Sequence, residues 1–324
     1  MNDEINSSAA RWAKQIEAQY ASFARQAGAS KPQMPETAGA VDGLLALAAI
    51  DSTNILARKM MSNGELSVID EQGLPRMIAI CADVQSAGHG RLGRQWSDKA
   101  GGASLLVTYC TALPQALVTD SHYNGWFTII AGLAALDALN SAMAECSAKP
   151  LDPAHTLELK WPNDVFYDGH KLGGILAEMV ALPKGMNLLA ESASDAVGVI
   201  FGIGINLDLA APSLPTPIST SLQLLYAPLP EPSTMRDMVA ARLAMALKRR
   251  LAAFVAEPQD TLLKLREETQ RACWTLGREV EAKFTDGSRL TGKAIALNAD
   301  ASLTIQDALG TLHVVKTGDV GVLA

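Results

Sequence analysis

The feature that most constrains the fold of this chain is a change in hydrophobic patterning near residue 273. Between about residues 41 and 272, apolar runs typical of buried strands alternate with longer apolar segments of helical spacing. After residue 273, short alternating segments are separated by D-G, N-A-D and L-G turns. This second pattern predicts a small antiparallel barrel of about 50 residues. The chain is therefore predicted to contain an α/β domain followed by a β domain.

The α/β region can be divided into predicted elements. A helix is predicted to begin at Ser52, Thr53 or Asn54, any of which can cap it. A helix over residues 129–144 is predicted to be buried on one side, and another is predicted over 234–268. The Pro-rich residues 211–233 are predicted to form a surface connection. Strands are predicted over 76–84, 103–110, 157–161, 165–167, 172–180 and 197–207, of which the last is apolar throughout.

The first 40 residues are predicted to be an attachment to this domain, made of a helix and a linker. Trp12, Ile16, Tyr20 and Phe23 recur at helical spacing, which predicts an amphipathic helix over residues 8–26. The Gly- and Pro-rich segment that follows is typical of a linker. Charges in these residues balance, and no basic recognition helix is present, so specific DNA binding is not expected.

Composition excludes several classes of protein. The apolar runs reach about ten residues, whereas a membrane-spanning helix needs about 20, so no membrane association is expected. The four Cys are far apart and the five His lack ligand-like spacing, which argues against disulfide frameworks and zinc sites. The amino terminus has no secretory h-region, so a cytoplasmic location is expected. The net charge of −7 disfavours general nucleic-acid binding.

A Gly-rich segment with two arginines is the first candidate binding element. Gly88, Gly90 and Gly93 have G-x-G-x-x-G spacing, but no helix pattern or acidic partner follows, and the Walker A sequence is absent. Guanidinium groups suit phosphate and carboxylate oxygens, and glycines allow close backbone approach, so Arg91 and Arg94 are candidates for anion binding. A basic surface loop is the simpler alternative.

Two further segments combine glycines with polar side chains. Lys160 ends an apolar strand at a Trp-Pro turn, and Lys171 lies beyond the next turn. Gly173, within a strand, suggests close backbone approach, and Gly204 and Asn206 could present backbone and amide groups to a ligand. The simpler alternatives are an edge-strand lysine and a strand bend at which an asparagine starts a turn.

Taken together, four segments resemble those of bacterial biotin protein ligases. They are DSTN (51–54), QSAGHGRLGRQW (85–96), KWPND with KLGGILAE (160–164 and 171–178) and GIGIN (202–206), in the family's order. The resemblance covers about residues 45–324 and implies a class II synthetase-like mixed sheet flanked by helices, followed by an SH3-like barrel. It implies an amino-terminal extension (1–40), a catalytic domain (41–272) and a carboxy-terminal domain (273–324). The short, charge-balanced amino terminus resembles monofunctional members without a DNA-binding domain.

The resemblance also implies an activity. Members join biotin to ATP as biotinyl-AMP and pass biotin to a lysine of a biotin carboxyl carrier protein, with Mg²⁺ at the leaving pyrophosphate. Cations between the two anionic reactants would remove their repulsion. By resemblance, Lys160 bridges the biotin carboxylate and the α-phosphate, and Arg91 and Arg94 neutralise phosphate oxygens. The implied binding residues are Ser52, Thr53, Asn54, Gln85, Gly88, His89, Gly90, Trp96, Lys171, Gly173, Gly204 and Asn206. Among them, Ser52, Thr53 and Gln85 would hydrogen-bond to the ureido ring, and Asn206 would hydrogen-bond to the adenylate. Trp96 would stack on the adenine or pack the loop over it.

One residue departs from the family pattern, and several alternatives stay open. His89 replaces the first arginine of the usual G-R-G-R-x-G-R loop, and a free histidine is mostly neutral at pH 7. Asp164 is expected to order the Lys160 turn or to bind a metal. A lipoate ligase of the same fold, a biotin-sensing DNA-binding regulator and a catalytically impaired binding protein are the alternative functions. A homodimer is compatible with the resemblance.

Overall fold

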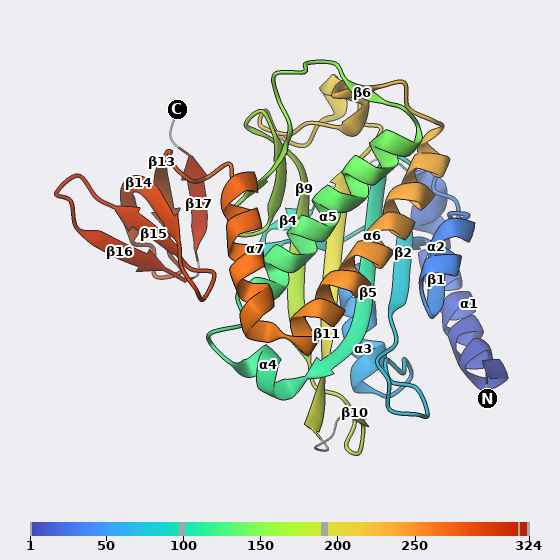
Figure 1. Ribbon diagram of the computed structural model, residues 1–324. Coiled ribbons are helices and arrows are strands. Elements are labelled where there is room, and N and C mark those ends of the chain that lie inside the picture. Colours follow the sequence, from blue (N-terminus) through green and yellow to red (C-terminus); the bar gives the residue numbers. More distant parts are fainter. Residues whose placement is uncertain (1, 97–100, 189–193, 317, 323–324) are drawn as a thin grey trace.

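A mixed β-sheet forms the centre of the computed structural model, which describes residues 2–96, 101–188, 194–316 and 318–322 (Figure 1). Its strand order is β1-β2-β5-β11-β9-β8-β7, and β10 pairs with β11 beside this path. β1 and β2 are parallel, whereas the other paired neighbours are antiparallel. The strands are β1 (Gly43–Ile50), β2 (Ile78–Gln85), β5 (Ser104–Pro114), β7 (Leu157–Lys160), β8 (Asp164–Tyr167), β9 (His170–Val180), β10 (Asn187–Leu188) and β11 (Ser194–Asn206).

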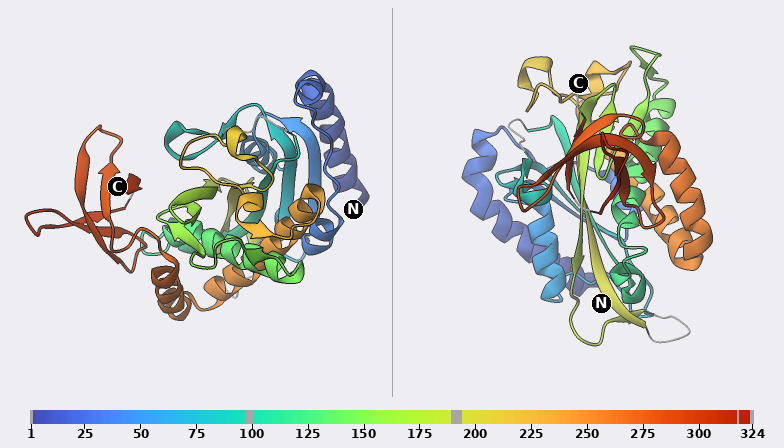
Figure 2. Two further views of the ribbon diagram at one scale, coloured as in Figure 1. Left: turned by 90° about the horizontal axis from the view of Figure 1, so that it is seen from above. Right: turned by 90° about the vertical axis from the view of Figure 1, so that its left-hand side faces the viewer.

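Helices cover both faces of this sheet. α5 (Trp126–Glu145) and α6 (Pro232–Ala256) pack side by side on one face, and α3 (Thr53–Ser62) packs on the other (Figures 1 and 2). α1 (Asn2–Gln26) contacts β1, so it lies at the opposite end of the molecule from the carboxy-terminal strands (Figure 2). The remaining short elements are α2 (Pro35–Ala40), α4 (Gln115–Thr119), α7 (Pro258–Ala272), the 3₁₀ turns Arg91–Gly93, Ala211–Ser213 and Leu222–Leu224, and strands β3 (Gly88–His89), β4 (Gln95–Trp96), β6 (Lys149–Pro150) and β12 (Tyr226–Ala227).

The last part of the chain forms a second sheet. Its order is β16-β15-β14-β13-β17, with every pair antiparallel. This sheet and the helix-flanked mixed sheet confirm the predicted fold class. Its strands are β13 (Glu279–Lys283), β14 (Arg289–Leu297), β15 (Leu303–Gln306), β16 (Leu312–Val315) and β17 (Asp319–Val322).

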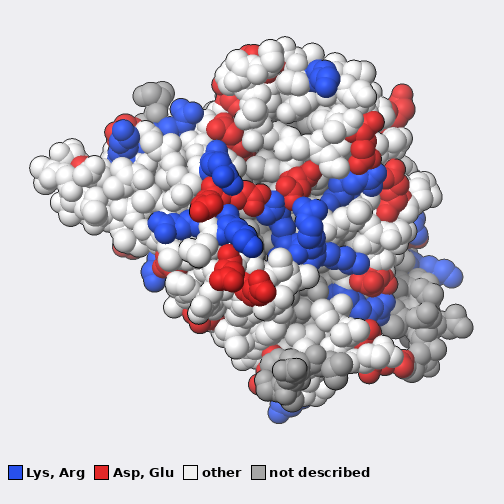
Figure 3. All heavy atoms as spheres, viewed as in Figure 1, with Lys and Arg blue, Asp and Glu red and all other residues white. Residues whose placement is uncertain are grey.

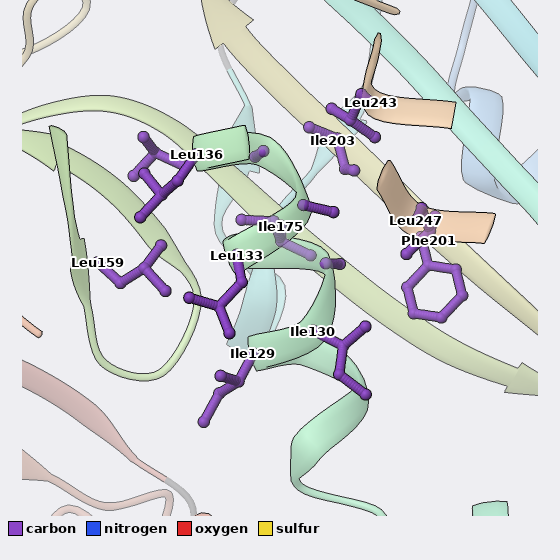
Figure 4. Packing of buried hydrophobic residues seen from close by; sticks show 14 of the residues in the cluster. Ile129, Ile130, Leu133, Leu136, Leu159, Ile175, Phe201, Ile203, Leu243 and Leu247 are labelled. Atoms are coloured by element: carbon purple, nitrogen blue, oxygen red, sulfur yellow. The ribbon is translucent and has the colours of Figure 1, made fainter. Parts of the chain in front are cut away.

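The main core lies between the sheet and the pair α5 and α6. Figure 4 shows Phe201 and Ile203 of β11 against Leu243 and Leu247 of α6, with α5 beside them. α5 also contacts β7, β8, β9 and α7, and most of its residues are buried. The prediction that this helix is buried on one side holds for its second half, where Asp137, Asn140 and Ala144 are accessible along one stripe, whereas residues 129–136 are buried all round. Among the described helices, α5 has the length and apolarity of a membrane span, but most of it is buried inside the protein.

Two other predictions about helices differ from the structure. The helix predicted over residues 234–268 is two helices, because Pro258 lacks an amide proton and starts α7 after Glu257. The predicted linker contains α2, whose Glu36 and Thr37 amides donate to the Asp237 carboxylate of α6 at 2.9 and 2.8 Å. A side chain 200 residues away thus caps this helix, so the local sequence carries no signal for it.

Candidate functional site

The predicted binding segments converge on one cavity of about 330 Å³ beside β11, β9 and the β3–β4 hairpin. Every predicted site residue except Gly88 and Gly173 lines it. The predicted residues in its wall are Ser52, Thr53, Asn54, Gln85, His89, Gly90, Arg91, Arg94, Trp96, Lys160, Lys171, Gly204 and Asn206. Segments that are far apart in sequence therefore form a single site.

The Gly-rich segment is a folded hairpin at this cavity. His89 pairs with Gln95, and the Gly90 amide donates to the Arg94 carbonyl at 2.6 Å. The turn needs two left-handed residues, Leu92 (φ 55°) and Gly93 (φ 72°), of which the glycine adopts this conformation without strain. Arg91 Nη1 donates to Asn163 Oδ1 at 3.1 Å, which ties the hairpin to the turn after Lys160. The alternative of a simple basic surface loop does not describe this arrangement.

Gly88 and Gly173 lie behind the wall and not in it. A Cβ atom at Gly88 would be 2.8 Å from the Trp96 carbonyl oxygen, and one at Gly173 would be 2.7 Å from the Gly204 carbonyl oxygen. Both positions thus require glycine for backbone packing, which confirms the close backbone approach predicted at Gly173. That either glycine binds the ligand stays a prediction. Gly204 has a different constraint, because a Cβ there would be 2.6 Å from the Trp96 ring.

Three charged side chains form a group in the wall. Asp164 lies between two ammonium groups, with Oδ1 2.8 Å from Lys171 Nζ and Oδ2 4.0 Å from Lys160 Nζ. The Lys160 side chain is only 14% exposed, and Lys171 Nζ lies 5.8 Å from the centre of the Trp96 ring. A carboxylate held in this way orders the two lysines, which favours that role over metal binding. In the described ranges, no group of three or more His, Cys, Asp and Glu side chains could hold a metal ion.

The turn that carries Lys160 is anchored by the carboxy-terminal segment. The Trp161 amide donates to Thr275 Oγ1 at 2.9 Å, and its indole Nε1 donates to the Ala301 carbonyl at 2.9 Å. The Trp274 amide donates to the Leu159 carbonyl at 2.8 Å. The second sheet and its connection therefore fix the position of Lys160, a contact for which the sequence analysis had no signal.

Neutral polar groups form another part of the wall. The Thr53 amide donates to Gln85 Oε1 at 2.7 Å, which orients the glutamine side chain. Asn206 is buried, and its Nδ2 donates to the Thr220 carbonyl at 2.9 Å. Its other amide atom, Oδ1, is left as an acceptor. The same cavity is therefore lined by neutral polar groups as well as by cations.

The predicted surface connection over 211–233 contributes to the site. Pro215, Thr216, Ile218 and Ser219 line the cavity. The Lys171 amide donates to the Ile218 carbonyl at 2.7 Å, and the Thr220 amide donates to the Lys171 carbonyl at 2.9 Å. The segment is a connection with residues 211–218 largely at the surface, as predicted, but its role in the site was not predicted and results from main-chain pairing with β9.

Comparisons with known proteins agree with this arrangement. Residues 60–188 match the model of the Biotin/lipoate A/B protein ligase family. The chain is 32% identical to a biotin–[acetyl-CoA-carboxylase] ligase of Mycobacterium tuberculosis over 75% of its length and 78% of the relative's. It is 34% identical to the same enzyme of Paracoccus denitrificans, over 50% of this chain and 53% of the relative.

A solved structure shares the fold. The biotin protein ligase of Aquifex aeolicus, in complex with biotin and ATP, matches with a TM-score of 0.60 and 22% identity. The match covers 87% of this chain and 97% of that structure. The extent and identity of the first relative, together with this fold, show that the chain belongs to the biotin protein ligase family.

Proposed function

We propose that this protein activates biotin with ATP to biotinyl-AMP and transfers biotin to a lysine of a biotin carboxyl carrier protein. One observation carries the proposal: a single cavity is lined both by cationic and by neutral polar side chains. Lys160, Arg91 and Arg94 are among the cationic ones, and Thr53 and Gln85 are among the neutral ones. Biotin needs both kinds of group, because it has a carboxylate at one end and an uncharged ureido ring at the other.

The first step joins two anions. A carboxylate oxygen of biotin attacks the α-phosphorus of ATP, and the bond to pyrophosphate breaks. Lys160, held in place by the Trp161 turn, reduces the repulsion between the carboxylate and the phosphate and stabilises the charge that develops between them. Arg91 and Arg94 suit the phosphate oxygens because guanidinium groups bind them in pairs of hydrogen bonds.

The second step needs no nucleophile from this chain. The ε-amine of the carrier lysine attacks the acyl carbon of biotinyl-AMP, AMP leaves, and one proton is released. The mixed anhydride supplies a good leaving group, so a Ser-His-Asp or Cys-His set is not required. The Trp96 ring and Asn206 Oδ1 are suitably placed in the wall for the adenine and the adenylate.

Magnesium is part of the proposal as a companion of ATP. Mg²⁺ commonly keeps waters and binds substrate phosphates with one or two carboxylates. The described residues form no acidic cluster, and Asp164 is engaged by lysines, so Mg²⁺ would be held chiefly by the nucleotide. When bound, it would neutralise charge on the leaving pyrophosphate.

Other features of the proposal concern partners and location. We propose a cytoplasmic enzyme without specific DNA binding, acting alone or as a homodimer, with the domain boundary after α7. On the face seen in Figure 3, Lys and Arg are interspersed with Asp and Glu, which does not favour binding of a polyanion. Arg242 with Glu145 and Arg250 with Asp137 are examples of this pairing. The dithiolane ring of lipoate has no N–H or C=O, so the neutral groups favour biotin over lipoate.

Biotin-dependent exchange of pyrophosphate into ATP tests the proposal. Lys160→Ala should lower the exchange rate by about 100- to 1,000-fold, because one preorganised charge contributes about 2.7–4 kcal/mol to the barrier. Lys293→Ala, at an exposed position of the second sheet, is the matched control and should keep the wild-type rate. Exchange with lipoate in place of biotin, or near wild-type exchange by Lys160→Ala, would contradict the proposal.

A further inference from the structure

We infer that Phe166 is a positioning residue whose ring face holds the Lys160 ammonium group in the cavity wall and leaves its charge available to the reactants. The inference rests on the proposed function, in which Lys160 lies between the biotin carboxylate and the α-phosphate. Phe166 lies on β8 and lines the cavity, and Lys160 Nζ lies 5.4 Å from the centre of its ring. A cation within about 6 Å of the centre of an aromatic face is attracted by the negative charge of that face.

Alternation along β8 separates Phe166 from the apolar core. Val165 and Tyr167 belong to the main core, whereas Phe166, although only 2% exposed, is not among the described residues of that core. Lys160 is paired with Asp164 in the hairpin of β7 and β8, and Phe166 follows Asp164 by two residues, so it lies on the same face. A buried aromatic ring on the face that carries the charged groups indicates an electrostatic role in addition to packing.

The ring differs from a carboxylate in its effect on the charge of the lysine. A carboxylate attracts an ammonium group but cancels its charge, whereas an aromatic ring attracts it without any net charge of its own. Asp164 lies closer to Lys171 than to Lys160, at 2.8 Å against 4.0 Å. The Lys160 side chain is 14% exposed, so little water competes with the ring. The attraction of the ring therefore holds Lys160 while its positive charge still acts on the two anions.

A second aromatic ring, from the carboxy-terminal segment, supports Phe166. The centre of the Trp274 ring lies 5.1 Å from that of Phe166, and the two planes are inclined by 38°. The Arg278 guanidinium lies over Trp274 at 4.5 Å from the ring centre, and its Nε donates to the Trp274 carbonyl at 2.8 Å. The Trp274 amide donates to the carbonyl of Leu159, the residue before Lys160. Phe166 thus contacts a tryptophan that is itself held in place, which limits the motion of its ring.

Fluorination of the ring tests the inference with little change of shape. Fluorine withdraws electron density from the ring face, so each fluorine atom weakens the attraction for a cation. Phe166 is replaced in the full chain by 4-fluoro-, 3,5-difluoro- and 3,4,5-trifluorophenylalanine, and kcat/KM for biotin is measured by pyrophosphate exchange. The logarithm of kcat/KM should fall stepwise with the number of fluorine atoms, to a total loss of about 2- to 30-fold.

The matched control is the same series at Phe201, a fully buried phenylalanine of the main core on β11. Its kcat/KM should stay within about 2-fold of wild type, because its ring packs against apolar side chains. A kcat/KM that does not depend on fluorination of Phe166 would overturn the inference. Equal losses in the two series would also overturn it, since they would show that the ring acts through packing alone.

Removal of the cation provides a second test. In the Lys160→Ala background, the residual exchange rate should no longer depend on fluorination of Phe166, because the group that the ring attracts is gone. The same dependence with and without Lys160 would overturn the inference. Failure of the wild-type protein to exchange pyrophosphate with biotin would instead overturn the proposed function, so the two failures can be told apart.

Discussion

The two faces of strand β11 differ in the size of their side chains and in what they contact. Phe201 and Ile203 point toward α5 and α6 (Figure 4), and both belong with Val199 to the main core. On the other face, Gly202 and Gly204 alternate with them and lie against Asn54 and Trp96. One face is filled by large apolar side chains, and the other has none at these positions, so that polar side chains and a ligand cavity can occupy the space.

This difference shows how one strand serves two functions without conflict. Alternation places successive side chains on opposite faces, so stability and binding are assigned to different residues of the same segment. The sequence of β11 reads as a continuous apolar run because no charged residue interrupts it between residues 196 and 206. From Phe201 to Ile205, however, large residues alternate with glycine. Substitutions on each face should therefore separate stability from binding.

The largest expected effect is on the core face. Phe201→Ala should lower the free energy of unfolding by about 3–5 kcal/mol, because it removes a fully buried ring and leaves a cavity. KM for biotin should change less than about 3-fold. Denaturant titration and steady-state kinetics measure the two quantities. A large rise in KM with little loss of stability would show that the two faces are not independent.

The converse substitution is on the cavity face. Gly204→Ala puts a Cβ atom 2.6 Å from the Trp96 ring, which must move out of the wall. We expect biotin activation to fall about 10- to 100-fold, since misplacement of a positioning group by about 1 Å costs on that order. The thermal midpoint should stay within a few degrees of wild type. If activity survives and stability collapses, the cavity face is structural and the comparison fails.

The smallest effect concerns pH and the apolar side of the sheet. Burial raises the pKa of the Cys81 thiol to about 12, whereas an unfolded thiol titrates near 8.5. The folded state therefore holds the proton more tightly, so this contribution is complete below about pH 8.5 and is lost as pH rises toward 12. The slope is at most about 1.4 kcal/mol per pH unit for one group. Cys81→Ala should reduce the alkaline fall in unfolding free energy; an identical slope in both proteins would argue against a buried, protonated thiol.

Prediction from the sequence succeeded where a motif carries its own residues. Lys160 and Arg91 are recognisable because a charged side chain beside glycines or a Trp-Pro turn is unusual within apolar strands, whereas Gln85 was identified through the family resemblance alone. The second sheet followed from periodicity, whereas the mixed sheet followed from the family resemblance. β1 has no such signal, because its Leu and Ala residues favour helices as much as strands.

The rest of the site depends on contacts between distant segments. Phe166 is a buried strand aromatic like Tyr167, and its distances to Lys160 and Trp274 distinguish it. Ile218 joins the wall through its carbonyl group, which every residue type possesses. Main-chain contacts do not depend on the identity of the side chain, so the sequence gives no signal for them.

The spread of the cavity along the chain has a consequence for folding. Its wall begins at Ser52 and ends at Ser219, and it draws on both outer and central strands of the sheet. A partly folded sheet lacks part of the cavity wall, so ligand binding stabilises the completely folded sheet and not partly folded forms. By thermodynamic linkage, ligand at 100 times its Kd adds about 2.7 kcal/mol to stability. Saturation with biotin and ATP should therefore slow amide exchange throughout the mixed sheet, far beyond the residues that line the cavity.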